Sequence, residues 1–231
     1  MKKANGTTIL HQRPAGKVRR NLLKDRAYAQ LKGRILTGDF EPGTVLSERQ
    51  IVGWLRMSKT PIRGALEKLE AEGLVRVSPQ QGILVREQSI HELADQFELR
   101  MALETYVARQ LAGRLTPKQV EELRANLAAQ ERSIRNQDIR EIVEFDTEFH
   151  ILFARFLGNE EILRAMEQLR GKINRVIIRV HAQNPERQGA SLLEHQAIAE
   201  AVIGGDAALA VRRVEEHLEI GKQYLISPRR R

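Results

Sequence analysis

The stretch from Leu46 to Val85 constrains the fold of this chain more than any other segment, because it holds two amphipathic helical patterns joined by a tight break. Ser47 stands at the N-cap position of the first pattern. Ile51 and Leu55 follow at i, i+4 spacing, which predicts a short helix with one apolar face. The helix is expected to end at Arg56-Met57, so a second helix can turn back against it.

The second pattern predicts a helix that begins at Ser58 or Thr60 and has Pro61 in its first turn, where a missing N–H costs nothing. Gly73 stands where a left-handed C-cap is favoured. The apolar residues recur at i, i+4 and i+7 and face inward: Ile62, Leu66 and Leu69. The outward N-terminal end then presents the residues that a recognition helix inserts into a major groove: Lys59, Thr60 and Arg63.

Two short strand patterns follow this second helix. Val75 and Val77 alternate with polar residues before a turn at residues 78–82, and Ile83 and Val85 alternate after it. Two such strands predict a hairpin wing. Together, the helices and the wing predict a winged helix-turn-helix, which is a DNA-binding fold.

The distribution of charge supports DNA binding. Residues 1–86 hold 17 Lys and Arg against 7 Asp and Glu, a balance of +10, whereas residues 87–231 hold 21 against 23, a balance of −2. The net charge of +8 therefore resides in the first third of the chain, where phosphate neutralisation needs it. Residues 1–20 are predicted to form a basic flexible arm, either a disordered tail or an arm that reaches a minor groove.

Composition limits the remaining classes of protein. The chain has no cysteine, which argues against a disulfide-stapled secreted protein and removes thiolate chemistry. No apolar run approaches the roughly 20 residues that span a bilayer, and the basic N-terminus lacks the apolar segment of a signal peptide. A cytoplasmic protein without membrane contact is expected.

Beyond residue 86, helical periodicity and capping signals replace the strand pattern. Capping boxes begin at Ser89 and Thr116, and helices are expected over about 89–114, from 116 onward, and over 138–157, 159–181, 191 onward and 206–225. The predicted fold class is mainly α. A winged helix-turn-helix over residues 21–86 precedes an all-α antiparallel helical bundle over residues 87–227.

Four polar side chains of the bundle fall on inward-facing stripes. Asp146 and His150 share a helix face with two phenylalanines at i+3 and i+7 from Asp146, and His195 and His217 lie on the apolar stripes of two other helices. Burying such groups without partners is costly. One divalent ion shared by all four would remove this cost, with Zn expected first and Ni or Mn as alternatives. The competing interpretation is that each is a hydrogen-bonded core residue.

Arg100 also lies on the apolar stripe of its helix. Its guanidinium would bind an effector carboxylate beside the metal, or else pair with Glu104 at i, i+4. Three His, one Asp and an open coordination position would also suit a metal-dependent hydrolase-like enzyme. Such an enzyme lacks a recognisable general base here and leaves the basic first third unexplained. An architectural DNA binder without an effector is the remaining alternative.

The motifs of the first third resemble the DNA-binding domain of GntR-family bacterial transcription regulators. The resemblance rests on residues 38–43, 46–49, 58–66 and 69–75. It implies that DNA is contacted by Arg49, Ser58, Lys59, Thr60, Arg63, Gln81 and Gly82. Three positions depart from the family pattern: Lys59 replaces the usual Arg, Arg56 a common turn Gly, and Gly64 a common Glu. These departures bear on the operator sequence more than on DNA binding itself.

The bundle resembles the FCD effector domain of the FadR-type GntR subfamily. The resemblance rests on residues 146–150, 158–159, 194–196, 205–206 and 216–218. Metal-binding members of that subfamily use the positions of Asp146, His150, His195 and His217, and similar regulators sense small organic acids. The resemblance implies an FCD-like effector-binding and dimerisation domain over residues 87–227.

Together, these observations predict a bacterial, nucleoid-associated transcription regulator that is not an enzyme. It is expected to be a repressor and a homodimer on palindromic double-stranded DNA. A small carboxylate bound at the metal site is expected to control its operator affinity. The operator, the effector and the direction of the effector's influence are left open by the sequence.

Overall fold

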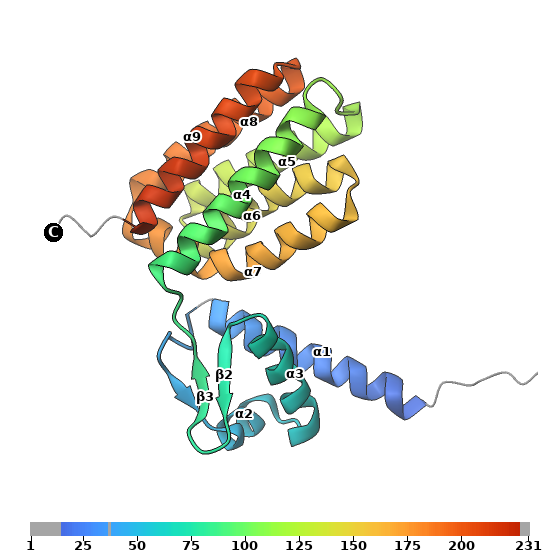
Figure 1. The fold of residues 1–231 in the computed structure, drawn as a ribbon, viewed down its shortest axis with the longest axis vertical. Coiled ribbons are helices and arrows are strands. Elements are labelled where there is room, and N and C mark those ends of the chain that lie inside the picture. Colours follow the sequence, from blue (N-terminus) through green and yellow to red (C-terminus); the bar gives the residue numbers. More distant parts are fainter. Residues whose placement is uncertain (1–14, 37, 227–231) are drawn as a thin grey trace, which may run out of the picture. The chain divides into compact units, whose positions relative to one another are not determined.

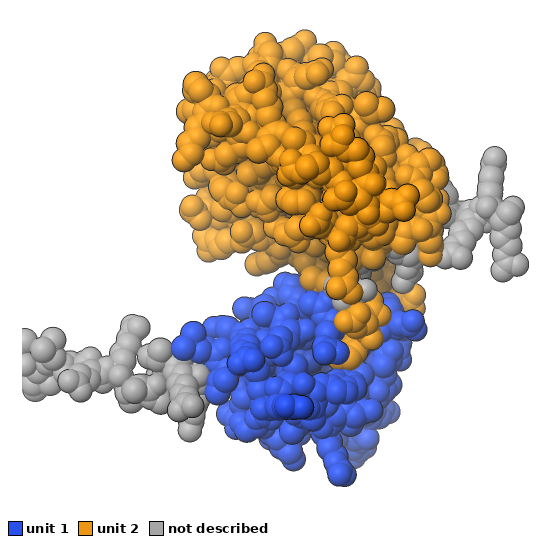
Figure 2. Space-filling model, turned by 180° about the vertical axis from the view of Figure 1, so that it is seen from behind, with its two compact units in different colours: residues 1–35, 41–86 blue, residues 36–40, 87–231 orange. Residues whose placement is uncertain are grey.

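The computed structural model describes residues 15–36 and 38–226, apart from several side chains at the helix ends and in the helix of residues 160–183. The chain divides into two compact units, coloured separately in Figure 2. The first unit comprises residues up to 35 and residues 41–86. The second comprises residues 36–40 and the chain from Glu87 onward.

The first unit is the predicted winged helix-turn-helix. Its elements are α1 (Ala15–Leu36), β1 (Val45–Leu46), α2 (Glu48–Leu55), α3 (Lys59–Ala71), β2 (Val75–Ser78) and β3 (Gly82–Val85). The three strands form an antiparallel sheet in the order β1-β3-β2, and β2 and β3 are the wing (Figure 1). The apolar stripe of α3 is buried, as its spacing predicts.

Local chemistry fixes the turn between α2 and α3. Ser47 and Gln50 form a reciprocal capping box at the start of α2. Arg56 ends the helix in the left-handed region at φ 50°. That conformation favours glycine, which accounts for the glycine common at this position in the family the motifs resemble.

The boundary expected at residue 20 is wrong, because α1 already begins at Ala15. Residues 15–20 of the predicted arm are therefore helical, and residues 1–14 lie outside the described residues. Ala27, Leu31 and Ile35 recur at i, i+4 and i+8 and are all buried, so tertiary packing anchors this helix. Its mean hydropathy is low, which hides it from a pattern search.

The second unit is an all-α antiparallel bundle, in agreement with the predicted fold class (Figure 1). Its helices are α4 (Ile90–Leu111), α5 (Pro117–Asn136), α6 (Ile139–Leu157), α7 (Glu160–Gln183), α8 (Pro185–Gly204) and α9 (Ala207–Ile226). Helix α4 packs on α9 and α6, α5 packs on α6 and α8, and α7 packs on α6. Within the described ranges, no helix combines the length and apolar composition needed to cross a membrane.

The capping signals of the bundle were predicted with one error. Ser89 and Thr116 form the expected capping boxes at α4 and α5. The expectation that a helix begins at Ser191 is wrong, because α8 begins at Pro185. Proline is well suited to a first helical turn, and the Ser-x-x-Glu pattern at residue 191 lies inside the helix. The Ser191 hydroxyl instead hydrogen-bonds within the bundle.

The core of the bundle predicts a clear difference between two leucines. Leu123 on α5 is fully buried in the main apolar cluster, whereas Leu193 on α8 is 67% exposed. Leu123→Ala should lower the free energy of unfolding by about 2–5 kcal/mol, because it removes buried area and leaves a cavity. Leu193→Ala is the matched control and should change it by less than about 0.5 kcal/mol. Urea denaturation followed by circular dichroism measures both, and equal effects would contradict the core assignment.

Candidate DNA-binding surface and metal centre

The predicted DNA-contacting residues of the helices share one property, which is exposure. The side chains of Arg49 on α2 and of Ser58, Lys59, Thr60 and Arg63 around the N-terminus of α3 are all exposed. They are free to approach a ligand because the apolar stripe of α3 is buried on the opposite side.

Arg63 is held in position by an acidic neighbour. Its Nε atom donates to Glu48 Oε1 at 2.6 Å and its Nη2 atom donates to Oε2 at 3.1 Å. The hydrogen bond from Arg63 lowers the pKa of Glu48 below its ordinary value, so the pair is charged at neutral pH. A bidentate pair fixes the plane of the guanidinium, which pre-orients it at the exposed end of α3.

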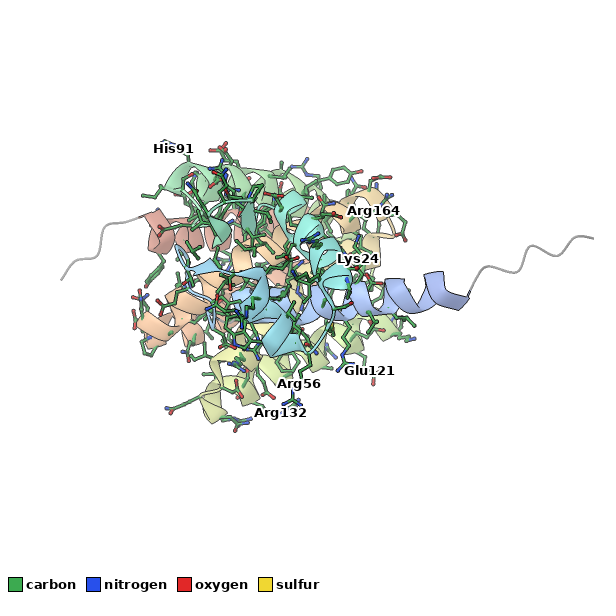
Figure 3. All side chains as sticks on the ribbon, turned by 90° about the horizontal axis from the view of Figure 1, so that it is seen from below. Lys24, Arg56, His91, Glu121, Arg132 and Arg164 are labelled. Carbon is green, nitrogen blue, oxygen red and sulfur yellow. The ribbon has the colours of Figure 1, made fainter. Side chains whose placement is uncertain are left out.

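The structure also explains why glycine is tolerated inside the recognition helix. A Cβ atom at Gly64 would lie 2.9 Å from Cδ of Lys24, because the aliphatic part of Lys24 crosses α3 at this point. Figure 3 labels Lys24 beside α3. Gly64 costs about 1 kcal/mol of helix propensity relative to alanine. The absence of a Cβ atom leaves room for the Lys24 side chain against α3.

The tip of the wing has a backbone requirement of its own. Gly82 has φ 94°, and a Cβ atom there would lie 2.8 Å from the carbonyl oxygen of Leu46. Only glycine fits this position between β1 and β3. Gln81, the residue before it, is exposed at the tip.

In the bundle, the structure brings three of the four predicted metal ligands together. His150 comes from α6, His195 from α8 and His217 from α9, and all three are buried. One ring nitrogen from each lies within 4.8 Å of the other two. The Nε2 atoms of His195 and His217 are 3.3 Å apart.

The Nδ1 atom of each imidazole is fixed by a different acceptor. His150 Nδ1 lies 2.6 Å from Glu104 Oε2, and His217 Nδ1 lies 2.7 Å from Glu194 Oε2. His195 Nδ1 lies 2.8 Å from Oε1 of Gln130. The amide of Gln130 is itself oriented, because its Nε2 atom donates to Asn126 Oδ1 at 2.7 Å. These acceptors place the proton on Nδ1 of each ring and leave the Nε2 lone pairs directed at one another.

Three buried imidazole nitrogens that face one another form a donor set suited to a cation. His150 Nε2 is buried without a hydrogen-bond partner among the described residues. Two nitrogen ligands of a tetrahedral Zn ion at about 2.0–2.1 Å stand about 3.3–3.4 Å apart. The Nε2 separation of His195 and His217 agrees with that spacing. The donor set therefore fits a divalent metal ion, and the acceptors on Nδ1 are the second shell that such a site uses.

Asp146, the fourth predicted ligand, lies at the edge of the cluster. Its Oδ1 atom is 3.8 Å from His195 Nε2 and accepts a hydrogen bond of 3.1 Å from the Ser191 hydroxyl. A further imidazole, His181 on α7, has its Nε2 atom 3.8 Å from the same oxygen. His181 is buried, and its Nδ1 atom has no hydrogen-bond partner in the described part of the chain.

Burial favours the neutral forms of His195 and His217. It lowers the pKa of His195 well below its ordinary value, and the charges of His217 and His150 act in the same direction. Burial also lowers the pKa of His217, although its hydrogen bond to Glu194 opposes the shift. Burial would raise the pKa of Glu194, but hydrogen bonds from His217 and Arg187 lower it to about 2. Neutral imidazoles beside ionised carboxylates are the forms that bind a metal ion.

A small cavity of about 40 Å³ adjoins the cluster. Its lining includes Asp146 and His217 from the metal site, together with Arg100, His181 and Arg187. Arg100 is buried, and its Nε atom donates to Glu104 at 2.6 Å. Its two Nη atoms have no hydrogen-bond partner among the residues that the structure describes. This geometry therefore allows Arg100 to pair with Glu104 through Nε and also to bind an effector carboxylate through its Nη atoms.

Sequence reasoning missed the residues that support the cluster. Glu104, Gln130, Glu194 and His181 were not recognised as part of it, because each is distant in sequence from the histidine or aspartate that it approaches. A partial signal existed for Glu194, which directly precedes His195, and for Glu104, which follows Arg100 at i+4. Only the packing of α4, α5 and α7 shows which of these side chains meet.

The fold defines a class of protein: a transcriptional regulator with a DNA-binding winged helix and an all-α second domain. Residues 23–85 match the family described as bacterial regulatory proteins of the gntR family, and residues 95–220 match the FCD domain. The chain belongs to the GntR family of transcriptional regulators and has the FCD domain of its FadR-like subfamily. Members of this family are regulators and not enzymes, which removes the hydrolase alternative.

Relatives and solved structures agree with this assignment. An HTH-type transcriptional regulator of Streptomyces ambofaciens is 31% identical over 83% of this chain and 80% of its own length. The HTH-type transcriptional repressor RspR of Escherichia coli is 28% identical over 85% of this chain and 86% of its own length. The structure of E. coli McbR/YncC superposes with a TM-score of 0.77, covers 88% of this chain and 96% of the other, and shares 22% identity, so it shows the same fold.

The buried histidines predict how stability depends on pH in metal-free protein. The folded-state pKa values of His181, His195 and His217 are lowered, whereas histidines in an unfolded chain titrate near 6.5. The unfolded state therefore binds more protons below about pH 6.5, and the free energy of unfolding should fall as the pH falls. The slope is about 1.4 kcal/mol per pH unit for each such histidine.

Urea denaturation in the presence of EDTA, at about pH 7.5 and about pH 5.5, measures this slope. His195→Asn should reduce the slope, because asparagine keeps a hydrogen bond to Gln130 but does not titrate. His91 is exposed on α4, so His91→Asn should leave the slope unchanged. Equal denaturation midpoints of the wild type at the two pH values would contradict the burial of neutral imidazoles.

Proposed function

We propose that this regulator is a repressor that binds a palindromic operator as a homodimer, and that a small organic acid controls its operator affinity from a metal site in the FCD domain. The bacterial nucleoid is its proposed place of action. The observation that supports this most strongly is the convergence of three imidazole Nε2 atoms beside a cavity that an arginine also lines.

The proposed DNA surface is the exposed N-terminal end of α3 with the wing tip. Arg49 contacts phosphate, and Lys59, Thr60 and Arg63 read base edges in the major groove. Ser58 positions the start of α3 on the backbone, and Gln81 and Gly82 approach the adjacent groove. Lys59 supplies a point charge in place of a guanidinium fork, so it discriminates guanine less strongly than arginine would.

The proposed sensor site is built from two parts that share the cavity. His150, His195, His217 and Asp146 hold a divalent ion, with Zn favoured by the nitrogen donors and Ni or Mn as alternatives. The ion supplies a Lewis-acidic position for one carboxylate oxygen of the effector when it is bound. Arg100 directs its two Nη atoms to the carboxylate, because Glu104 occupies only its Nε atom.

Repression is supported by a relative, and dimerisation is proposed from the symmetry that a palindromic operator requires. RspR of E. coli is named a repressor, and it shares most of its length with this chain. A two-fold dimer presents two recognition helices to a site with matching two-fold symmetry. Binding of the acid shifts the bundle between states with different affinity for that operator.

The proposed DNA surface predicts which arginines the operator needs. Arg63→Ala should lower affinity for a duplex selected from a random pool by about 10–100-fold and relax the preference at one base position. Arg49→Ala should weaken binding to all duplexes alike and reduce the salt dependence by about one counterion. Fluorescence anisotropy at several salt concentrations measures both.

A matched control separates this surface from general charge. Arg132 is exposed on α5 in the second unit and is labelled in Figure 3. Arg132→Ala removes the same charge and should leave affinity unchanged. If Arg63→Ala and Arg132→Ala have the same effect, the assigned surface is wrong.

The proposed sensor site predicts a linked loss of metal and of acid response. The purified wild type should contain close to one divalent ion per chain by elemental analysis, and His195→Ala with His217→Ala should remove it. Carboxylic acids from a small panel should change operator affinity of the wild type by about 5–150-fold, which corresponds to a coupling of about 1–3 kcal/mol. The double variant should still bind the operator and ignore the acids.

A metal-free wild type whose operator affinity no acid changes would contradict the sensor proposal. Binding that is salt-sensitive and indifferent to DNA sequence would instead favour the architectural DNA binder.

A further inference from the structure

Two glutamates of the bundle connect the cavity arginines to the histidines of the candidate metal centre. Glu194 lies between Arg187 and His217, and Glu104 lies between Arg100 and His150. Both arginines line the same cavity, which Asp146 and His217 also line. Each glutamate is therefore shared between a group that faces a ligand and a group that faces a metal ion.

The series of contacts through Glu194 is bidentate at its arginine end. Arg187 Nη1 donates to Oε1 at 2.5 Å and Nη2 donates to Oε2 at 2.6 Å, while His217 Nδ1 lies 2.7 Å from the same Oε2. The side chain of Arg187 is 4% exposed, so water competes little with the pair. One carboxylate oxygen accepts from a guanidinium and an imidazole at once.

The series of contacts through Glu104 has the same order of arginine, glutamate and histidine. Arg100 Nε donates to Oε1 at 2.6 Å, and His150 Nδ1 lies 2.6 Å from Oε2. All three side chains are buried. His195 differs from both, because its Nδ1 atom faces the neutral amide of Gln130, which no arginine contacts in the described part of the chain. Two of the three imidazoles are thus linked to the cavity, and the third is not.

We propose that Glu104 and Glu194 are positioning residues that couple the anion cavity to the metal centre, each by sharing one carboxylate between a cavity arginine and a metal-binding histidine. This inference rests on the proposed sensor site and specifies how its two halves influence each other. The ligand that acts through it is a carboxylate that either displaces Glu194 from the Nη atoms of Arg187 or binds the Nη atoms of Arg100 and so shares that guanidinium with Glu104.

The direction of the coupling follows from charge. An arginine that binds a carboxylate draws electron density from it, so the carboxylate accepts less strongly from the imidazole N–H. When an anion in the cavity takes over the arginine, the glutamate accepts more strongly from Nδ1–H. The Nε2 lone pair then becomes a better metal ligand, because second-shell carboxylates raise the basicity of a metal-bound histidine. Anion and metal therefore raise each other's affinity by the same factor.

Substitutions of the glutamate and of the arginine in the series Arg187–Glu194–His217 should have opposite effects on metal binding. With Zn²⁺ alone, measured by competition with a chromogenic chelator, Glu194→Gln should weaken affinity by about 10–100-fold, the range found for lost second-shell partners. Arg187→Met should strengthen affinity, because it releases Glu194 as a bound anion would. Arg187→Lys keeps the charge but not the bidentate geometry and should lie between Arg187→Met and the wild type.

An arginine that lines a neighbouring cavity provides the control for simple charge removal. Arg170 on α7 lines a neighbouring cavity with His150 but binds Glu144 and Glu148, which contact no histidine among the described residues. Arg170→Met should change Zn²⁺ affinity by less than about twofold. Circular dichroism confirms folding of each variant. Should Arg187→Met fail to fold, Arg100→Met and Glu104→Gln test the same opposite signs.

The outcomes separate this inference from the proposed function. A wild type that does not bind Zn²⁺ overturns both the sensor proposal and the coupling. If the wild type binds Zn²⁺ but Glu194→Gln and Arg187→Met both weaken it, the residues are merely structural and the coupling is wrong. If Arg170→Met strengthens binding as much as Arg187→Met does, general electrostatics explains the effect and the coupling through Glu194 is overturned.

Discussion

Burial of three imidazoles at one point is the constraint on which the second unit depends. Their Nδ1 atoms are satisfied by Glu104, Gln130 and Glu194, each from a helix that packs against the ring it holds. The Nε2 atoms then meet in a space that water barely enters, and a lone pair left there without a donor or cation costs several kcal/mol. The packing of α4, α5 and α8 around this point therefore serves the chemistry of the site as well as the apolar core.

The two units differ in where the charges of their candidate sites lie. In the first unit, the cations of the proposed DNA surface are exposed, and Arg63 stays exposed while Glu48 fixes its orientation. In the second unit, Arg100 and Glu104 form a buried ion pair, and buried Arg187 pairs with Glu194, whose pKa of about 2 keeps it ionised at neutral pH. An exposed charge is suited to a polyanion that arrives from solvent, and a buried network is suited to a small ligand that must displace one partner to enter.

The sequence predicted well wherever a feature is local. The N-cap at Ser47, the break at Arg56, the inward stripe of α3 and the capping boxes at Ser89 and Thr116 each depend on residues within a few positions of one another. The prediction of helix boundaries failed where a capping pattern occurs inside a helix or where a helix has little apolar periodicity. Ser191 resembles an N-cap but lies inside α8, and α1 has little apolar periodicity although Leu31 and Ile35 are buried. Tertiary contacts override weak local preference in both cases.

Periodicity and charge are properties of neighbouring residues, so they can be read from the sequence. They were enough to predict the two-part architecture and the DNA-binding class of the first unit. They also predicted that His150, His195 and His217 lie on inward faces of their helices. The convergence of these three faces on one point is visible only in the folded chain. The same holds for the position of Asp146 between His181 and His195. It also holds for the contacts by which Glu104 and Glu194 join the cavity arginines to the cluster. Those contacts span up to 67 positions along the chain, as between His150 and His217. Helix packing sets such long-range neighbours, and no local pattern encodes it.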